Sequence, residues 1–327
     1  MNAGQDARFM AAAIALAGRG RARTTPNPNV GCILVKEGRI VGRGWTQPGG
    51  RPHAEAMALA EAGEAARGST AFTSLEPCAH QSLRGPACTN GLIAAGVTRV
   101  VSAALDPDIR TNGQGFERLA AGGIAVESGP MASEARAVMA GWWSRETRGR
   151  PFVTLKLATS LDGCIALANG ESRWITGEAA RAHGHLERAR ANMIVVGRGT
   201  LEADSPRLDV RLPGLEDRSP RRGLLTSGSA PDGWETLASP EAIKDFEDVD
   251  WILVEGGAAT AASFLKAGLV DRLLLYRAPI TIGGGRSSLG DIGLDRMGDA
   301  HGQWHRTDTR QLGSDTLDIY VRADKEG

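Results

Sequence analysis

The sequence has 327 residues, with 38 acidic and 38 basic side chains. Because one hydrophobic core usually serves ~100–200 residues, this length predicts two domains. The balanced charge argues against a protein that binds the nucleic-acid backbone, which normally carries a basic excess. No apolar run approaches the ~20 residues of a membrane span, and the N-terminus lacks the basic region of a signal peptide. We therefore expect a cytoplasmic protein that binds neither nucleic acid nor membrane.

The first half of the sequence alternates short apolar runs with amphipathic patterns. The periodicity predicts helices over residues 6–18, 53–63 and 131–147. Strands are expected at 30–35 and 40–45, as a hairpin, and at 70–75 and 99–105, with a further helix between the last two. Gly149 and Pro151 interrupt the pattern before a new strand, so we place a domain boundary between residues 148 and 149.

The second half restarts the same alternation. Strands are expected at 152–159, 193–197, 251–257, 273–280 and 316–323, with helices over 177–191 and 258–268. Strands that alternate with helices are typical of a largely parallel sheet, so each half is expected to be an α/β domain with such a sheet. Residues 205–248 are rich in Pro, Gly and charged side chains, and the pattern predicts no structure for them.

One histidine, one glutamate and two cysteines in the first half form a pattern with metal chemistry. His53 and Glu55 open a predicted helix, Cys78 follows a strand, and Cys88 opens another helix. One imidazole and two thiolates leave the fourth tetrahedral position of Zn²⁺ for water, as a catalytic site requires. Zinc lowers the pKa of that water to about 7, and Glu55 is placed to shuttle its proton. His-x-Glu followed by Pro-Cys is the signature of zinc-dependent nucleobase deaminases.

These residues also have simpler interpretations. A cysteine alone is more often a small buried core residue, and Cys32, inside an apolar strand, is interpreted in that way. A closed structural zinc site would need a fourth ligand, for which His80 is the nearby candidate. The order of the residues and their positions beside predicted strands favour the catalytic site.

Long segments in both halves match one protein family in the same order. They are TTPNPNVGCILV, PHAEAMAL, STAFTSLEPCAH, FVTLKLATSLDG, SRWITGEAAR, MIVVGRGTLEADSPRLDVR, and LVEGGA followed by LVDRLLLYRAPI. These segments resemble the bifunctional deaminase–reductases of riboflavin biosynthesis. The resemblance implies a cytidine-deaminase-like domain at 1–148 and a dihydrofolate-reductase-like α/β domain at 149–327. The first would hydrolyse the 2-amino group of a diaminohydroxyphosphoribosylaminopyrimidine, and the second would use NADPH to reduce the ribosylamino group of the product.

The resemblance also implies roles for individual residues and a homodimeric assembly. In the deaminase half, Asn27, Arg84 and Asp106 match positions that contact the pyrimidine substrate. In the reductase half, the matched substrate and catalytic positions are Lys156, Thr176, Asp204 and Glu255. An acid is useful there because the sugar must open to an imine-like form, and either Asp204 or Lys156 would serve.

Two further sets in the reductase half match positions that bind phosphate groups. Ser172, Arg188 and Arg211 match residues that hold the ribose phosphate, for which the planar guanidinium is well suited. Glycine lets backbone N–H groups approach a pyrophosphate closely. The positions expected to face NADPH are Gly197, Gly199, Thr200, Gly256 and Gly257.

The sequence departs from the family pattern at several positions. Thr46 stands where the family has histidine, Asp108 where it has asparagine, and Cys164 where it has lysine. Only fifty residues separate Asp204 from Glu255. We therefore expect one strand–helix unit in the 205–248 segment, near the adenosine end of the cofactor, to be shortened or lost. On the helix at 177–191, His183 and His185 are expected to face solvent.

Two other functions are compatible with these features. The deaminase alone could be active, with the second half acting as a binding or dimerisation module, and the short 205–248 segment favours this alternative. A nucleic-acid deaminase related to tRNA-editing enzymes is disfavoured by the zero net charge and by the reductase-like second half.

Overall fold

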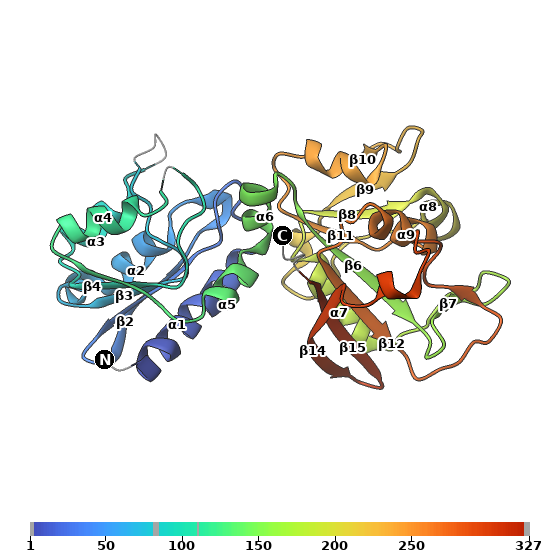
Figure 1. Ribbon diagram of the computed structural model, residues 1–327, viewed down its shortest axis with the longest axis horizontal. Helices are drawn as coiled ribbons and strands as arrows, with labels where there is room; N and C mark the ends of the chain where they lie inside the picture. The colour runs from blue at the N-terminus through green and yellow to red at the C-terminus, as the bar shows by residue number, and fades with distance from the viewer. Residues whose placement is uncertain (1–2, 81–84, 110, 324–327) are drawn as a thin grey trace. The chain divides into compact units, whose positions relative to one another are not determined.

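The computed structural model describes residues 3–80, 85–109 and 111–323. The chain divides into two compact units, residues 1–150 and 151–327, each with its own sheet and its own core (Figure 1). Among the described residues, none of the helices combines the length and the apolar character of a membrane span.

The first unit is built on a five-stranded sheet with the order β2-β1-β3-β4-β5. Its strands are β1 (Gly31–Lys36), β2 (Arg39–Trp45), β3 (Thr70–Thr73), β4 (Arg99–Ser102) and β5 (Ala125–Ser128). The predicted hairpin of the first two strands is confirmed, and the expectation of a largely parallel sheet holds for four of the five strands, with β1 as the exception. β1 pairs antiparallel with both β2 and β3, whereas β3, β4 and β5 pair parallel with one another, so β1 alone runs against the other four strands.

Helices cover both faces of this sheet because glycines let them approach the strands closely. The helices are α1 (Ala3–Ala17), α2 (Ala54–Ala62), α3 (Cys88–Ala94), α4 (Gln114–Ala121), α5 (Ala132–Val138) and α6 (Ala140–Arg148). A Cβ on Gly31 would lie 1.9 Å from the Ala13 carbonyl oxygen of α1, and one on Gly44 would lie 2.0 Å from the Ala54 oxygen of α2. Gly44 pairs with Cys32 and therefore faces the same side of the sheet as Cys32. Gly31, the neighbour of Cys32 in the strand, faces the other side, so α1 and α2 lie on opposite faces.

The second unit contains an eight-stranded sheet in which the predicted parallel arrangement is confirmed. Six parallel strands, in the order β10-β9-β8-β11-β6-β12, are followed by the antiparallel β15 and β14. The strands with predicted positions are β6 (Phe152–Thr159), β8 (Met193–Gly197), β11 (Trp251–Val254), β12 (Arg272–Arg277) and β15 (Asp315–Arg322). The sequence pattern did not reveal β14 (Trp304–Leu312), nor the two-stranded ribbon of β7 (Cys164–Ala166) and β13 (Arg286–Ser287).

Residues 205–248 contain two further strands, β9 (Arg221–Leu225) and β10 (Trp234–Leu237), which pair parallel to each other. Parallel neighbours usually need a crossover of a dozen or more residues, most often a helix. Here the connection consists of residues 226–233, and it contains no helix. This unit therefore has a strand pair in the segment but no helix between its two strands.

The helices of this unit are α7 (Glu178–Arg188), α8 (Arg198–Asp204) and α9 (Ala258–Lys266). The register of β6 with β12 places Lys156 opposite Leu274, on the sheet face that packs against α7 through Leu274 and Tyr276. The opposite face carries Leu155 and packs against α9. Lys156 therefore projects from the α7 face of the central strand.

Two of the glycines expected to face a cofactor are also required for packing. A Cβ on Gly256 would lie 2.4 Å from the Thr260 Cβ, and one on Gly197 would lie 2.1 Å from the Thr260 Oγ1. By contrast, nothing lies within 4 Å of a Cβ on Gly199. Glycine at 197 and 256 lets the ends of β8 and β11 pack against α9.

Gly256→Ala should therefore lower the free energy of unfolding by about 1–3 kcal/mol, the usual cost of overpacking a close contact. The matched control is Gly199→Ala, which adds the same methyl group to open space in α8 and should not destabilise the protein. Thermal unfolding followed by circular dichroism compares the two variants. Equal melting temperatures for both would contradict the packing argument.

Candidate active sites

Three of the predicted metal ligands meet in the first unit. His53 directly precedes α2, Cys78 lies in the loop after β3, and Cys88 is the first residue of α3. Their ligand atoms all lie within 4.8 Å of one another. His53 Nδ1 is 3.2 Å from the Cys88 Sγ and 3.7 Å from the Cys78 Sγ. One nitrogen and two sulfur donors fit Zn²⁺, which accepts mixed N/S tetrahedral sets.

The surroundings of Cys78 favour the thiolate, the form that binds metal. The Cys88 backbone N–H, at the start of α3, donates to the Cys78 Sγ at 3.3 Å. Hydrogen bonds from the Cys88 thiol and from His53 outweigh burial and lower the pKa of Cys78 to about 4. Cys78 is therefore prepared for a cation before one binds, whereas the hydrogen bond to Cys78 and burial raise the pKa of Cys88.

Glu55 lies beside the ligands. Its side chain is 3% exposed, and its Oε2 is 3.2 Å from the Cys88 Sγ. Burial raises the pKa of Glu55 above its usual value. A buried carboxyl group with a raised pKa can both take up and release a proton near neutral pH.

Asn27 and Asp106, two expected substrate contacts, lie in different surroundings. The Asn27 side-chain amide is 2.9 Å from the His53 Nε2, so it holds the ring nitrogen that faces away from the cysteines. A partner of this kind fixes the orientation of a ligating histidine. Asp106 is buried and accepts the Asp108 N–H at 2.8 Å, and burial raises its pKa to about 7. The third expected contact, Arg84, lies outside the described residues.

Three other residues singled out from the sequence have structural partners. Thr46 is buried, and its Oγ1 accepts the Val30 N–H at 3.0 Å. The His80 Nδ1 lies 3.3 Å from the Thr111 Oγ1. Within the described residues the metal-ligand cluster consists of three side chains and does not include His80, which argues against a closed structural site. Cys32 is fully buried in the core, as interpreted from the sequence.

The second unit has two adjoining cavities of about 670 and 560 Å³. The larger one, called here the glycine cavity, is lined by all five residues expected to face a cofactor: Gly197, Gly199, Thr200, Gly256 and Gly257. The smaller one, the arginine cavity, is lined by Thr176, Arg188 and Arg211. Lys156, Ser172, Asp204 and Glu255 line both cavities and so mark the boundary where they meet.

A cluster of three charged side chains occupies this boundary. Arg188 Nε and its Nη2 donate to the two carboxylate oxygens of Glu255 at 2.8 and 2.9 Å, and the Lys156 Nζ lies 3.6 Å from the same carboxylate. Burial by itself would raise the pKa of Glu255, but the two cations outweigh it and lower the pKa to about 2. Glu255 is therefore a permanent anion at neutral pH and cannot serve as the acid.

The arginine cavity carries more positive charge than the sequence analysis assigned to it. Besides the predicted Lys156, Arg188 and Arg211, it is lined by Arg173, Arg181 and Arg207. The acidic residues on its lining are Asp204 and Glu255. Arg181 and Arg188 share one face of α7, a signal that helical spacing could have revealed. Arg173 and Arg207 lie in irregular segments and follow no pattern.

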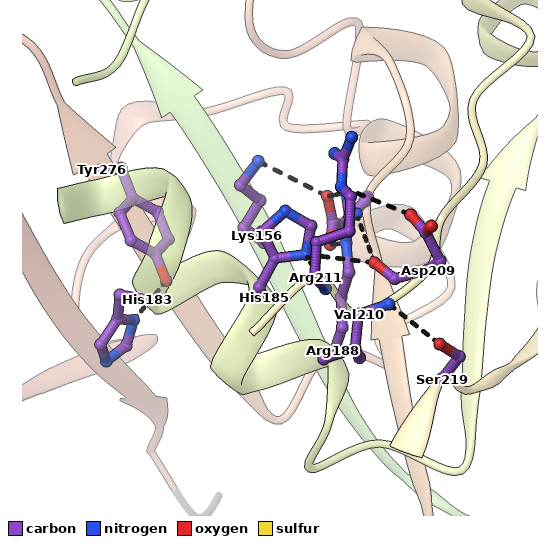
Figure 2. A network of polar contacts seen from close by, with 10 residues as sticks. Lys156, His183, His185, Arg188, Asp209, Val210, Arg211, Ser219 and Tyr276 are labelled. Atoms are coloured by element: carbon purple, nitrogen blue, oxygen red, sulfur yellow. Dashed lines mark hydrogen bonds and ion pairs between the residues drawn. The ribbon is translucent and has the colours of Figure 1, made fainter. Parts of the chain in front are cut away.

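The expectation that His183 and His185 face solvent is wrong. Both are half-buried, because α7 packs against the sheet and against the segment after α8. The His183 Nδ1 is 2.7 Å from the Tyr276 hydroxyl, and the His185 Nδ1 is 3.1 Å from the Asp209 carbonyl oxygen (Figure 2). Of the two, only His185 lines the arginine cavity.

Comparison with known proteins agrees with this arrangement. Residues 3–104 match the cytidine and deoxycytidylate deaminase zinc-binding region, and residues 151–232 and 241–317 match the RibD C-terminal domain. The chain is 38% identical to the riboflavin biosynthesis protein RibD of Escherichia coli (strain K12), with 95% of this chain and 98% of that protein covered. The chain belongs to the RibD family.

Other members of the family give the same result. The RibD protein of Aquifex aeolicus is 37% identical, with 88% of this chain and 91% of that protein covered. The solved structure of Acinetobacter baumannii RibD matches with a TM-score of 0.88 and 33% identity, covering 99% and 100% of the two chains. A domain with a cytidine-deaminase zinc-binding region is thus followed by an α/β domain that matches the RibD C-terminal domain.

Replacing both cysteines, in Cys78→Ser, Cys88→Ser, should remove zinc from the protein. Two of the three donors are thiolates, and a serine hydroxyl is a poor substitute for either. Metal analysis of the purified chain should give about one zinc before the change and none after it. Cys32→Ser, a change of the same kind in the core, should retain the metal. Stoichiometric zinc in the double variant would refute this ligand set.

Proposed function

We propose that the chain is a bifunctional enzyme of riboflavin biosynthesis, with a deaminase at residues 1–148 and a reductase at 149–327. The deaminase would hydrolyse diaminohydroxyphosphoribosylaminopyrimidine to an aminouracil phosphate and ammonia. The reductase would then reduce the ribosylamino group of that product with NADPH. The observation that carries the proposal is the presence, in one chain, of a His/Cys/Cys cluster beside Glu55 and of a glycine cavity that meets a cationic cavity.

In the deaminase, His53, Cys78 and Cys88 would hold zinc, which supplies a water of lowered pKa. Glu55 would take a proton from that water at its carboxylate and pass it to the ring nitrogen of the pyrimidine as the hydroxide adds to the ring carbon. It would then take the proton of the added hydroxyl group and pass it to the amine, which leaves as ammonia when the C–N bond breaks. Its burial and its position beside the ligands support this role. Asn27 would keep the His53 ring in place while its remaining polar atom contacts the pyrimidine. Asp106 and Arg84 complete the proposed substrate contacts.

In the reductase, NADPH would supply the hydride from the glycine cavity. Ser172, Thr176, Arg188 and Arg211 would hold the substrate in the arginine cavity. Lys156, Asp204 and Glu255 would act where the two cavities meet. Because Glu255 stays ionised, its role would be to hold Arg188 and Lys156 in position. The proton that opens the sugar would come from Asp204 or Lys156.

The proposal also covers the class of substrate, the cellular compartment and the assembly of the chain. The zero net charge and the size of the two cavities suit a small phosphorylated pyrimidine and not a nucleic acid. We further propose that the enzyme works in the cytoplasm, where NADPH and reduced thiols are available. A homodimer is the proposed assembly, which sedimentation of the purified chain would test.

Glu55→Gln should retain zinc and reduce ammonia release by about a hundredfold or more, the scale of general acid–base catalysis. The amide keeps the shape of the side chain but cannot carry the proton. The measurements are the zinc content and the rate of ammonia release. Loss of metal from the variant would make Glu55 a ligand, and near-normal ammonia release would exclude it as the proton shuttle.

Lys156→Ala and Asp204→Asn should each abolish NADPH oxidation with the deaminated substrate and leave ammonia release unchanged. Both residues lie where the two cavities meet, and neither belongs to the first unit. Absorbance of the reduced nicotinamide follows the reaction, and ammonia release is the internal control. If the unaltered chain releases ammonia but oxidises no NADPH, the second unit is a binding module, the alternative that the short 226–233 connection favours.

A further inference from the structure

One face of α7 lines the arginine cavity with three basic side chains. Arg181, His185 and Arg188 lie four and three residues apart, and such positions stack along one face of a helix. Arg188 already has a role in the proposed function. His185 has none, although Figure 2 shows its ring between Lys156 and Arg211.

The two ring nitrogens of His185 have different surroundings. Its Nδ1 lies 3.1 Å from the Asp209 carbonyl oxygen and 3.3 Å from the Arg211 backbone nitrogen. Through this nitrogen the ring ties α7 to the segment that carries Arg211. Within the described part of the chain, the hydrogen bonds of His185 all use Nδ1. Its Nε2 is therefore left for a molecule in the cavity.

The charges around the ring select an anion. Arg188 of α7 and Arg211 of the following segment are close enough to His185 to lower its pKa. Asp209 and Glu255 face it as well, but Asp209 pairs with Arg207 at 2.6 Å and Glu255 is held by Arg188. The other charged residues of the cavity are Lys156, Arg173, Arg181 and Asp204. His185, Arg188 and Arg211 line only the arginine cavity, so this anion is not the pyrophosphate of a cofactor in the glycine cavity.

We propose that His185 donates a hydrogen bond from Nε2 to the phosphate of the reductase substrate and joins Ser172, Arg188 and Arg211 in the proposed phosphate site. This inference rests on the proposed reductase function and adds a residue to it. Arg188 alone is poorly suited to the task, because three of the roughly five donors of a guanidinium are already bonded to Glu255 and Asp209.

The site has a consequence for pH dependence. In the free protein, burial and then the two arginines lower the pKa of His185, so the ring is neutral at neutral pH. A bound phosphate dianion adds negative charge beside the ring and raises that pKa. Binding therefore takes up a proton, and the affinity for the phosphate falls as the pH rises from the lowered pKa of the free ring toward its raised pKa in the complex.

The test is His185→Asn, whose amide can occupy the position of Nδ1 and keep the tie to Asp209 and Arg211, but which has no atom at Nε2. The KM for the phosphorylated, deaminated substrate should rise about tenfold or more at pH 6.5, as expected when a charged hydrogen bond is lost. The KM for NADPH, and the KM for the same substrate without its phosphate, should not change. His183→Asn is the matched control on the same helix, and it should leave the pH dependence of KM intact.

Two results would overturn the inference. One is an unchanged KM for the phosphorylated substrate in His185→Asn, and the other is an equal rise for the substrates with and without phosphate, which would mean a purely structural role. If the unaltered chain oxidises no NADPH, the proposed function fails, and calorimetry with ribose 5-phosphate still tests the site. Proton uptake on binding should then be larger for the unaltered chain than for His185→Asn. Any ribose 5-phosphate that binds to the first unit contributes equally in the two chains, so it does not affect the difference. Equal proton uptake would refute the phosphate site.

Discussion

The reductase-like unit depends on the charge of one carboxylate, that of Glu255. Burial opposes its ionisation, and the anion persists because Arg188 and Lys156 both approach it. Arg188 belongs to α7, Lys156 to the central strand β6, and Glu255 follows β11, so one ion cluster joins three elements. Replacing any one of the three side chains would leave a buried charge without its partner. The resulting loss of stability is larger than the stabilisation that the ion pair itself provides. The same cluster fixes the boundary between the two cavities.

Much of the fold and the whole zinc cluster could be predicted from the sequence, because both depend on local patterns. Apolar periodicity located the strands at 152–159 and 193–197 almost to the residue. The metal ligands were recognisable because each lies in a short loop or at the start of a helix. At such positions the spacing along the chain determines where the side chain points. An imidazole followed by two cysteines at such positions is a specific pattern for a metal site.

The remaining features depend on contacts between distant residues, which leave no local pattern. Glu255 meets Arg188 across 67 positions of the chain, and neither residue alone indicates the other. The environment of His185 depends on where the segment after α8 folds back, which helical periodicity does not report. The first sheet is mixed because β1 turns into β2 as a hairpin and also pairs antiparallel with β3, a choice of neighbours that alternation cannot determine.

The connection between β9 and β10 shows how the unit manages without a crossover helix. A helix would satisfy its own backbone groups, whereas a short loop needs outside partners. Arg198 supplies one of them, since its Nη2 donates to the Ser229 carbonyl oxygen, and its Nε donates to the side-chain Oγ1 of Thr226. The Thr226 Oγ1 also accepts the Gly228 N–H. Arg198 lines the glycine cavity, so the side chain that closes this loop also forms part of the cavity wall. The structure of the loop and the shape of the glycine cavity are therefore coupled through one arginine, and a change that frees Arg198 from Thr226 would alter both.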